Sequence, residues 1–125
     1  PCEDLITFLK DVFGAEERLR MPMPGGVIGH CELLINGGLV MVSDVMDPFP
    51  ATKAGVHLYV DDVDATYAKA MEKGATSLMA PDNMFYGDRT SAILDPFGNI
   101  WNISRHVEDM TEEEMMKRIE ATFQQ

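Results

Sequence analysis

Two of the three histidines and one glutamate are the side chains whose spacing could carry acid–base or metal chemistry. His30 and Glu32 lie two residues apart in an alternating segment, so in a strand both would point to the same face. His57 lies in a second such segment and could meet them if two sheets face each other across a pocket. His57 and Glu32 are then the candidate catalytic residues, acting as a general acid–base pair. The same three residues could instead bind a divalent metal, Zn, Ni, Mn or Fe, or His30 and Glu32 could form a structural hydrogen-bonded pair.

An arginine next to a tight turn forms the most specific polar cluster of the chain. Arg89 follows Tyr86, Gly87 and Asp88. Its planar guanidinium could bind a carboxylate or phosphate of an acidic ligand. It could instead form an internal brace with Asp88 or Asp95 that holds the turn in shape.

The last alternating segment separates polar from apolar side chains. The sequence DPFGN at 95–99 predicts a turn, and the strand expected over 100–104 follows it. Trp101 and Ile103 would share one face of this strand, with Asn102 and Ser104 on the other. A polar residue on the inner face of a half-buried strand often marks a pocket, so Asn102 is a candidate ligand contact.

Several large side chains could line an apolar pocket wall. Tyr59, Phe85 and Met41 are candidates for this wall. Trp101 could stack on a planar ligand or pack in the core. His106, just beyond the last expected strand, could reach the rim of the pocket or cap the linker to the final helix.

The elements that must position these residues occur twice along the chain. Two Gly-Ala pairs, at 14–15 and 74–75, each end an amphipathic helix. The first copy is expected to contain a helix at 3–13 and strands at 18–23, 27–35 and 39–43. The second copy is expected to contain a strand at 56–60, a helix at 62–73, strands at 77–79, 90–94 and 100–104, and a long turn at 81–88. The first copy lacks only its opening strand, which would precede Pro1.

This duplication predicts a single α+β domain over residues 1–125. We expect module one at 1–47, a linker at 48–54, module two at 55–106 and a C-terminal helix at 111–123. Thr111 and Glu114 are placed as a capping box at the start of that helix.

Composition restricts the class of partner. The net charge of −11, with only 10 Lys and Arg residues, argues against nucleic acid, whose phosphates bind clustered basic side chains. No apolar run is long enough to span a membrane. Two cysteines outside any CxxC pair, and no secretory leader, favour a reduced, cytoplasmic setting. The expected partner is therefore a small molecule.

Three segments together resemble the vicinal oxygen chelate superfamily, which includes glyoxalase I, bleomycin-resistance-type proteins and extradiol dioxygenases. They are FLKDVFGAEE, HLYVDDVDATYAKAMEKGA and DPFGNIWNIS. The segment NMFYGDR, which precedes DPFGNIW, resembles sequences of the PhnB-like branch of this superfamily. The resemblance implies two βαβββ modules whose sheets curl around a cleft, a homodimer that completes two such clefts, and Tyr86 near the cleft mouth.

The resemblance also implies positions for metal ligands, and these positions hold poor ligands here. They fall on Met41, on Gly55 with His57 two residues further along, and on Asn102. Hard divalent ions prefer carboxylate or imidazole donors, so the standard metal site is not expected.

Three functions remain open from the sequence. The first is a metal-free or weakly metal-binding protein that holds a small organic molecule, and the missing ligands favour it. The second is a metal-dependent lyase, isomerase or dioxygenase of the glyoxalase type that uses His30, Glu32 and His57. The third is a dimerisation or regulatory module with a vestigial cleft. The expected ligand contacts are His30, Glu32, Met41, His57, Tyr59, Tyr86, Arg89, Trp101 and Asn102.

Overall fold

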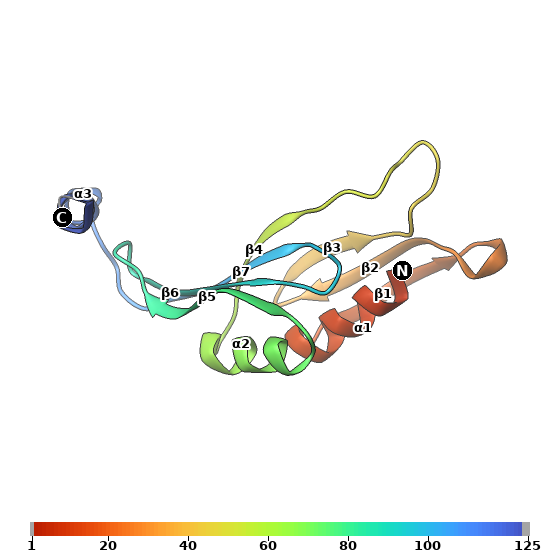
Figure 1. The fold of residues 1–125 in the computed structure, drawn as a ribbon, viewed down its shortest axis with the longest axis horizontal. Coiled ribbons are helices and arrows are strands. Elements are labelled where there is room, and N and C mark those ends of the chain that lie inside the picture. Colours follow the sequence, from red (N-terminus) through yellow and green to blue (C-terminus); the bar gives the residue numbers. More distant parts are fainter. Residues whose placement is uncertain (1, 124–125) are drawn as a thin grey trace.

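Two β-sheets, each with a helix packed on the same side, build the fold (Figure 1). The computed structural model describes residues 2–123. The first unit consists of α1 (Cys2–Phe13), β1 (Glu16–Pro22), the short 3-10 helix η1 (Pro24–Gly26), β2 (Ile28–Ile35) and β3 (Gly38–Val42). The second consists of β4 (Gly55–Tyr59), α2 (Val63–Glu72), β5 (Thr76–Asn83), β6 (Asp88–Leu94) and β7 (Ile100–His106), and α3 (Glu112–Phe123) follows it.

The sheet topology confirms the predicted α+β fold with duplicated units. The first sheet has the antiparallel order β1-β2-β3, and the second has the order β4-β7-β6-β5 with β4 parallel to β7. The first sheet has no counterpart of β4 within residues 2–123. Consequently β3 is an edge strand, and β4 is an edge strand because it stands at the end of the second sheet.

The core lies between the helices and the sheets. The buried positions of α1 include Ile6, Leu9 and Val12, whose spacing places them on one side of a helix. In β2 the alternation predicted from the sequence is confirmed, because Cys31, Leu33 and Ile35 are buried. The intervening residues His30, Glu32 and Leu34 are only partly buried and point to the opposite, helix-free face.

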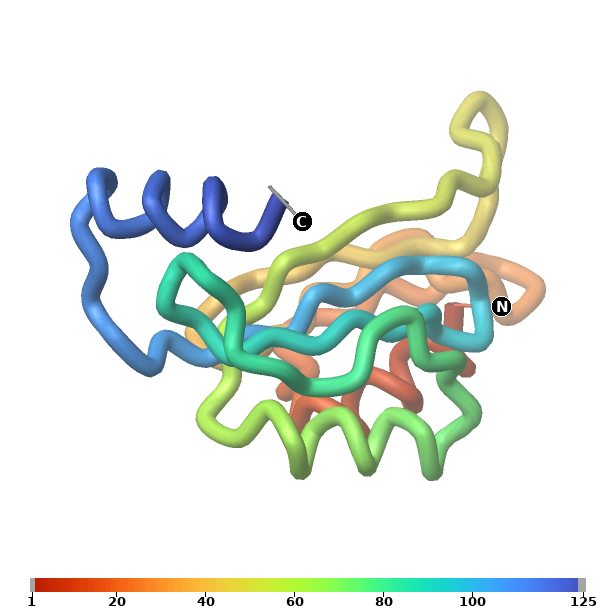
Figure 2. The backbone as a smooth tube through the Cα atoms, turned by 60° about the vertical axis from the view of Figure 1, so that its left-hand side comes forward, coloured from red at the N-terminus to blue at the C-terminus, as the bar shows by residue number. Residues whose placement is uncertain are grey.

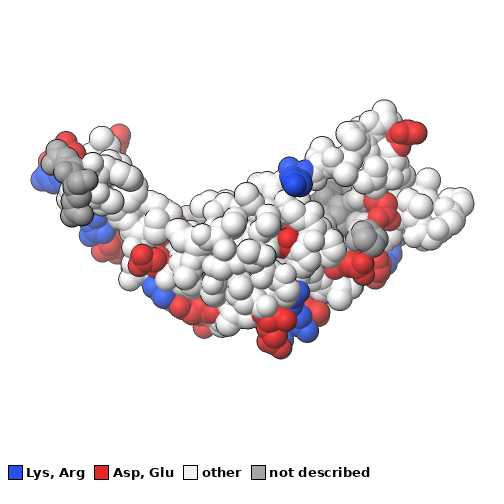
Figure 3. Space-filling model, viewed as in Figure 1, with Lys and Arg blue, Asp and Glu red and all other residues white. Residues whose placement is uncertain are grey.

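The helix-free faces of both sheets form the concave side of a crescent (Figures 1 and 3). Both α1 and α2 lie on the convex side. This arrangement leaves the concave side open for function.

One expected boundary is wrong. The segment from 81 to 88 was expected to be a long turn, yet β5 continues through Pro81 to Asn83. Proline lacks the N–H that a central strand needs, but β5 is an edge strand, where that loss is tolerated.

The C-terminal helix α3 begins with the predicted capping box. The backbone N–H of Glu114 donates to Thr111 Oγ1 at 3.1 Å, and the N–H of Thr111 donates to Glu114 Oε2 at 3.4 Å. None of the residues of α3 is buried. Figure 2 shows the helix separated from the sheets and joined to β7 by one connecting segment. No helix within residues 2–123 has the length and apolar character needed to cross a membrane.

Candidate functional site

Polar side chains gather on the concave face of the second sheet. In the β4–β7 register His57 lies opposite Asn102 and Tyr59 lies opposite Ser104. The β6–β7 register continues the same face. It pairs Thr90 with Ser104, Asp88 with His106 and Ala92 with Asn102. Because directly opposed residues on neighbouring strands share a face, all of these side chains point to the concave side.

Asp88 is the centre of this network. Its carboxylate is buried, accepts a hydrogen bond from the Tyr59 hydroxyl at 2.6 Å, and lies 3.0 Å from His106 Nδ1. The other ring nitrogen of His106 lies 2.7 Å from Asp109 Oδ1. An imidazole can donate from both nitrogens only when it is protonated. The carboxylates of Asp109 and, less strongly, Asp88 accordingly raise the pKa of His106 above its ordinary value.

Tyr59 is held in its protonated form by the same network. Its hydrogen bond to Asp88, with a smaller contribution from burial, raises the pKa of the phenol. The hydroxyl proton is engaged with Asp88, so the ring is the part of Tyr59 that remains for a ligand.

A second chain of hydrogen bonds positions His57. Its Nε2 lies 3.0 Å from Ser104 Oγ, which lies 3.0 Å from Thr90 Oγ1, and Thr90 is 3.4 Å from the Tyr86 hydroxyl. Ser104 is fully buried, so its hydroxyl orients the imidazole and is not exposed as a nucleophile. The rings of His57 and Tyr59 stack at 5.7 Å with an interplanar angle of 22°. They form a flat surface, and half of the Tyr59 surface is exposed (51%).

The concave face of the first sheet is mostly apolar. His30 Nε2 and Glu32 Oε2 form a pair at 2.8 Å. Five residues on the adjacent strands lie directly opposite this pair and its neighbour Leu34. They are Leu19, Met21, Leu39 and Met41, with Glu16 at one end.

The structure brings together two of the three residues that could have formed a metal or acid–base site. His30 contacts Glu32, whereas His57 belongs to the network of the second sheet. Among residues 2–123 no three His, Cys, Asp or Glu side chains come together to hold a metal ion. The ligand positions implied by the resemblance offer a thioether at Met41, an amide at Asn102 and no side chain at Gly55. This donor set does not fit a hard divalent ion.

Arg89 lies on the opposite side of the sheet from the network, between Asp88 and Thr90 along β6. Its Nε and Nη2 bind both carboxylate oxygens of Asp64 at 2.7 and 2.8 Å, and Nη1 binds Asn83 at 3.2 Å. The pair lowers the pKa of Asp64. Arg89 is therefore a brace between β6 and α2, and the expected brace partners, Asp88 and Asp95, were wrong.

Trp101 also lies away from the concave side. Its ring is buried and lies 5.0 Å from the ring of Phe13, and its indole N–H donates to Asp95. Together with Arg89, it belongs to the scaffold that supports the network.

The sequence identified His57, Tyr59, Tyr86 and Asn102 but not the residues that connect them. Asp88, Thr90 and Ser104 were not singled out as site residues, and His106 was expected to lie at the pocket rim or in the linker. The available signal was the alternation of polar residues along β6 and β7, at 88 and 90 and at 102, 104 and 106.

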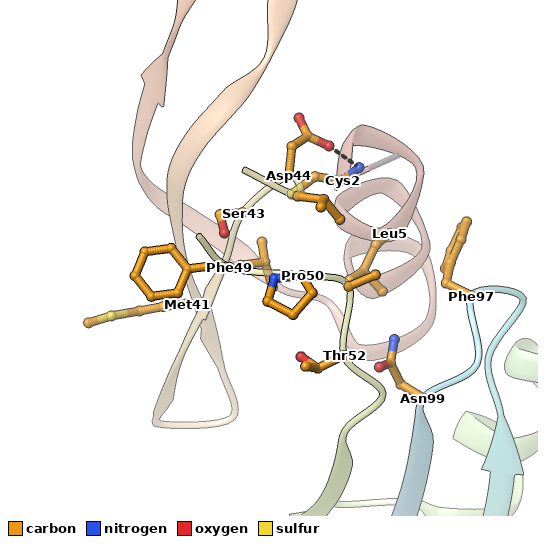
Figure 4. Close-up of a pocket in the computed structure, with 13 residues that line it drawn as sticks. Cys2, Leu5, Met41, Ser43, Asp44, Phe49, Pro50, Thr52, Phe97 and Asn99 are labelled. Atoms are coloured by element: carbon orange, nitrogen blue, oxygen red, sulfur yellow. Dashed lines mark hydrogen bonds between the residues drawn. The ribbon is translucent and has the colours of Figure 1, made fainter. Parts of the chain in front are cut away.

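A cavity of about 530 Å³ lies beside the free edge of β3 (Figure 4). Cys2 and Leu5 of α1, Phe49 of the 43–54 connection and Phe97 of the β6–β7 turn contribute to its wall. Met41 is the residue that this cavity shares with the concave face of the first sheet. None of the residues of the polar network lines it, so the cavity and the network are separate features.

Comparisons with known proteins agree with the geometry. A family model described as the Glyoxalase/Bleomycin resistance protein/Dioxygenase superfamily matches residues 2–103. An uncharacterised protein of Mycobacterium bovis is 35% identical over 121 residues, covering 88% of this chain and 80% of the relative.

Solved structures of similar fold include TioX from Micromonospora sp. ML1, with 29% identity and a TM-score of 0.71. That match covers 84% of this chain and 89% of TioX. They also include TnmS3, an antibiotic binding protein from Streptomyces sp. CB03234, with 24% identity and a TM-score of 0.65. That match covers 83% of this chain and 85% of TnmS3.

Proposed function

Because the chain belongs to the Glyoxalase/Bleomycin resistance protein/Dioxygenase superfamily, we propose that it binds a small organic molecule on its concave side. The observation that carries this proposal is the stacked pair of His57 and Tyr59 beside Asn102. A planar group of a ligand can stack on these rings. The amide of Asn102 offers both a donor and an acceptor for orientation.

The superfamily inferred from the sequence is confirmed by the family match. The PhnB-like branch stays a prediction. TnmS3 is described as an antibiotic binding protein, and its sequence is 24% identical to this chain. Similarity at this level supports the fold alone. The ligand proposal therefore depends on the residues of the concave face.

Two copies of the chain complete the cleft in this proposal. Within one chain, the apolar concave surface of the first sheet and the polar network of the second lie side by side along the crescent (Figure 1). A second copy facing the first would place an apolar surface opposite each polar network. In Figure 3 most charged residues lie on the convex side and at the ends, while the concave rim is largely uncharged apart from one basic residue. Exposed apolar surfaces of this kind mark binding interfaces.

Charge favours a neutral or cationic ligand over an acidic one. The concave face carries the carboxyl group of Glu32 with that of Asp88 buried beneath it, and the net charge of the chain is −11. Arg89, which could have bound an acid, is engaged with Asp64 on the other side of the sheet.

Binding of planar dyes tests the proposal. We expect the cationic dye thioflavin T to bind more tightly than the anionic dye 8-anilinonaphthalene-1-sulfonate in fluorescence titrations. His57→Ala and Tyr59→Ala should each weaken dye binding about fivefold, since a lost stacking contact is worth on the order of 1 kcal/mol. Tyr59→Phe keeps the ring and should bind within about threefold of the natural chain.

Arg89→Ala is the matched control because Arg89 lies on the opposite side of the sheet. It should leave dye affinity unchanged. Equal affinity of the natural chain, His57→Ala and Tyr59→Ala for both dyes would refute the proposed site.

A further inference from the structure

The helix α3 carries an apolar stripe that its own chain leaves uncovered. Met116 is 54% exposed and Phe123 is 74% exposed, and Met115 and Ile119 beside them are only partly buried. These residues fall on one side of the helix, because positions four and seven apart face the same way. A stripe of this kind needs a partner surface.

The opposite side of α3 is attached to its own chain. Arg118 Nη1 donates to Glu108 Oε1 at 2.7 Å and to the carbonyl oxygen of Phe85 at 3.3 Å. Each helical residue turns the direction by about 100°, so Met116 lies about 200° from Arg118 and Phe123 about 140° from it. By the same measure Met115 lies about 60° and Ile119 about 100° from Arg118, so Met116 and Phe123 are the part of the stripe that points away from the contacts that hold the helix.

The segment that leads into α3 is fixed to the second sheet. The N–H groups of Val107 and Glu108 donate to the carbonyl of Gly87 at 2.9 and 3.0 Å. Gly87 has a φ of 95°, and a Cβ at this position would lie 2.3 Å from the carbonyl oxygen of Glu108. Only glycine permits this close approach, which holds Val107 and Glu108 against the β5–β6 turn.

A matching apolar surface is on the concave face of the first sheet. Leu19, Met21, Leu39 and Met41 lie there, and each is about half exposed. This surface is at the end of the crescent opposite to α3, and α3 rises on the concave side (Figure 1). The helix cannot reach the first sheet of its own chain. A second copy turned end to end by a two-fold rotation would bring each α3 onto the first sheet of the other, in two identical contacts.

We propose that α3 docks on the first sheet of a second copy of this chain and forms the end wall of the ligand cleft. This inference rests on the two-copy cleft of the proposed function and adds the element that closes it. Four methionines lie at the contact, Met21 and Met41 on one side and Met115 and Met116 on the other. Their unbranched, polarizable side chains adapt well to such a surface.

Crosslinking between differently tagged chains tests the docking directly. A tagged Met116→Cys chain is mixed with an untagged Met21→Cys chain, left to exchange subunits, and treated with a short bismaleimide. The native thiols Cys2 and Cys31 are both buried, and burial raises the pKa of Cys2 to about 11, so they react slowly. We expect a covalent product of one tagged and one untagged chain. No more product than with Lys69→Cys, an exposed position on α2 on the convex side, would overturn the docking.

Sedimentation equilibrium gives an independent measurement. Met116→Asp combined with Phe123→Asp should raise the dimer dissociation constant at least about tenfold, because two apolar contacts are lost. Lys117→Glu changes the net charge by the same two units and should leave the constant unchanged. A natural chain that stays monomeric, or a double variant that dimerises normally, would overturn the docking.

The two proposals fail in different ways. If dye binding depends on His57 and Tyr59 but the tagged–untagged product does not form, the ligand site is supported and the docking of α3 is refuted. Crosslinking without dye binding retains the docking and removes the ligand proposal.

Discussion

The indole nitrogen of Trp101 donates a hydrogen bond of 2.9 Å to the carboxylate of Asp95. Asp95 is buried and also accepts from the backbone N–H of Phe97 at 2.8 Å and of Asn99 at 3.0 Å, and from Asn99 Nδ2 at 3.0 Å. One carboxylate thus connects the β6–β7 turn to the core. The DPFGN segment, which the sequence predicted as a turn, is a structural junction behind the polar network.

Removal of the Asp95 carboxylate should destabilise the fold. We expect Asp95→Ala to lower the free energy of unfolding by about 2–4 kcal/mol, because four donors lose a charged acceptor. Urea unfolding followed by the fluorescence of Trp101, the single tryptophan, measures the change. Asp61→Ala, at an exposed position, should change stability by less than about 0.5 kcal/mol. Equal effects of the two substitutions would contradict this role for Asp95.

A substitution of Ser91 should increase the stability of the fold. Its Oγ is buried and has no hydrogen-bond partner among residues 2–123. Ser91→Ala should raise the free energy of unfolding by about 1 kcal/mol, because an unsatisfied polar group is removed from the core. Ser104→Ala is the matched comparison and should destabilise, since Ser104 Oγ bonds both His57 and Thr90. A destabilising Ser91→Ala would show that its hydroxyl has a partner.

His106 should give the protein a measurable pH dependence. Its pKa is raised by Asp109 and then Asp88, so protonated His106 stabilises the fold fully below the ordinary pKa of about 6.5. That stabilisation is lost as the pH rises through the higher pKa of the folded state. NMR titration should place the His106 pKa above 6.5, and Asp109→Asn should lower it. In His106→Gln the decline in thermal stability above neutral pH should be smaller. An ordinary pKa for His106 would show that the two ion pairs do not form in solution.

The Arg89–Asp64 brace should contribute little stability and nothing to binding. Both side chains are partly exposed, so Arg89→Ala should lower the urea midpoint of unfolding only slightly. Asp64→Ala should lower it by about the same amount, and the double variant should lower it by less than the sum of the two. A marked loss of dye affinity in Arg89→Ala would restore the interpretation that Arg89 binds an acidic ligand.

Local patterns predicted much of this fold. The alternation in β2 and β7 gave the correct faces, and the spacing of Thr111 and Glu114 gave the start of α3. These features depend on residues that are near each other in the chain. Pro81 was misleading because its effect depends on whether β5 is an edge strand, which is a property of the whole sheet.

The candidate site depends on contacts that no local pattern contains. Asp88 and His106 are 18 residues apart, and Arg89 and Asp64 are 25 apart. The register of β6 against β7 decides that Asp88 meets His106, while Arg89, one position later, points to the other face. A shift of one residue would exchange their roles.

The apolar and polar concave surfaces lie on different sheets of one chain, and this separation affects how the number of binding sites depends on the amount of protein. In the proposed assembly each binding site needs two chains, so at low abundance the number of complete sites grows with the square of the chain concentration. A cell that made twice as much of this protein would then gain about four times the capture capacity. The number of complete sites would therefore change more steeply than the amount of protein.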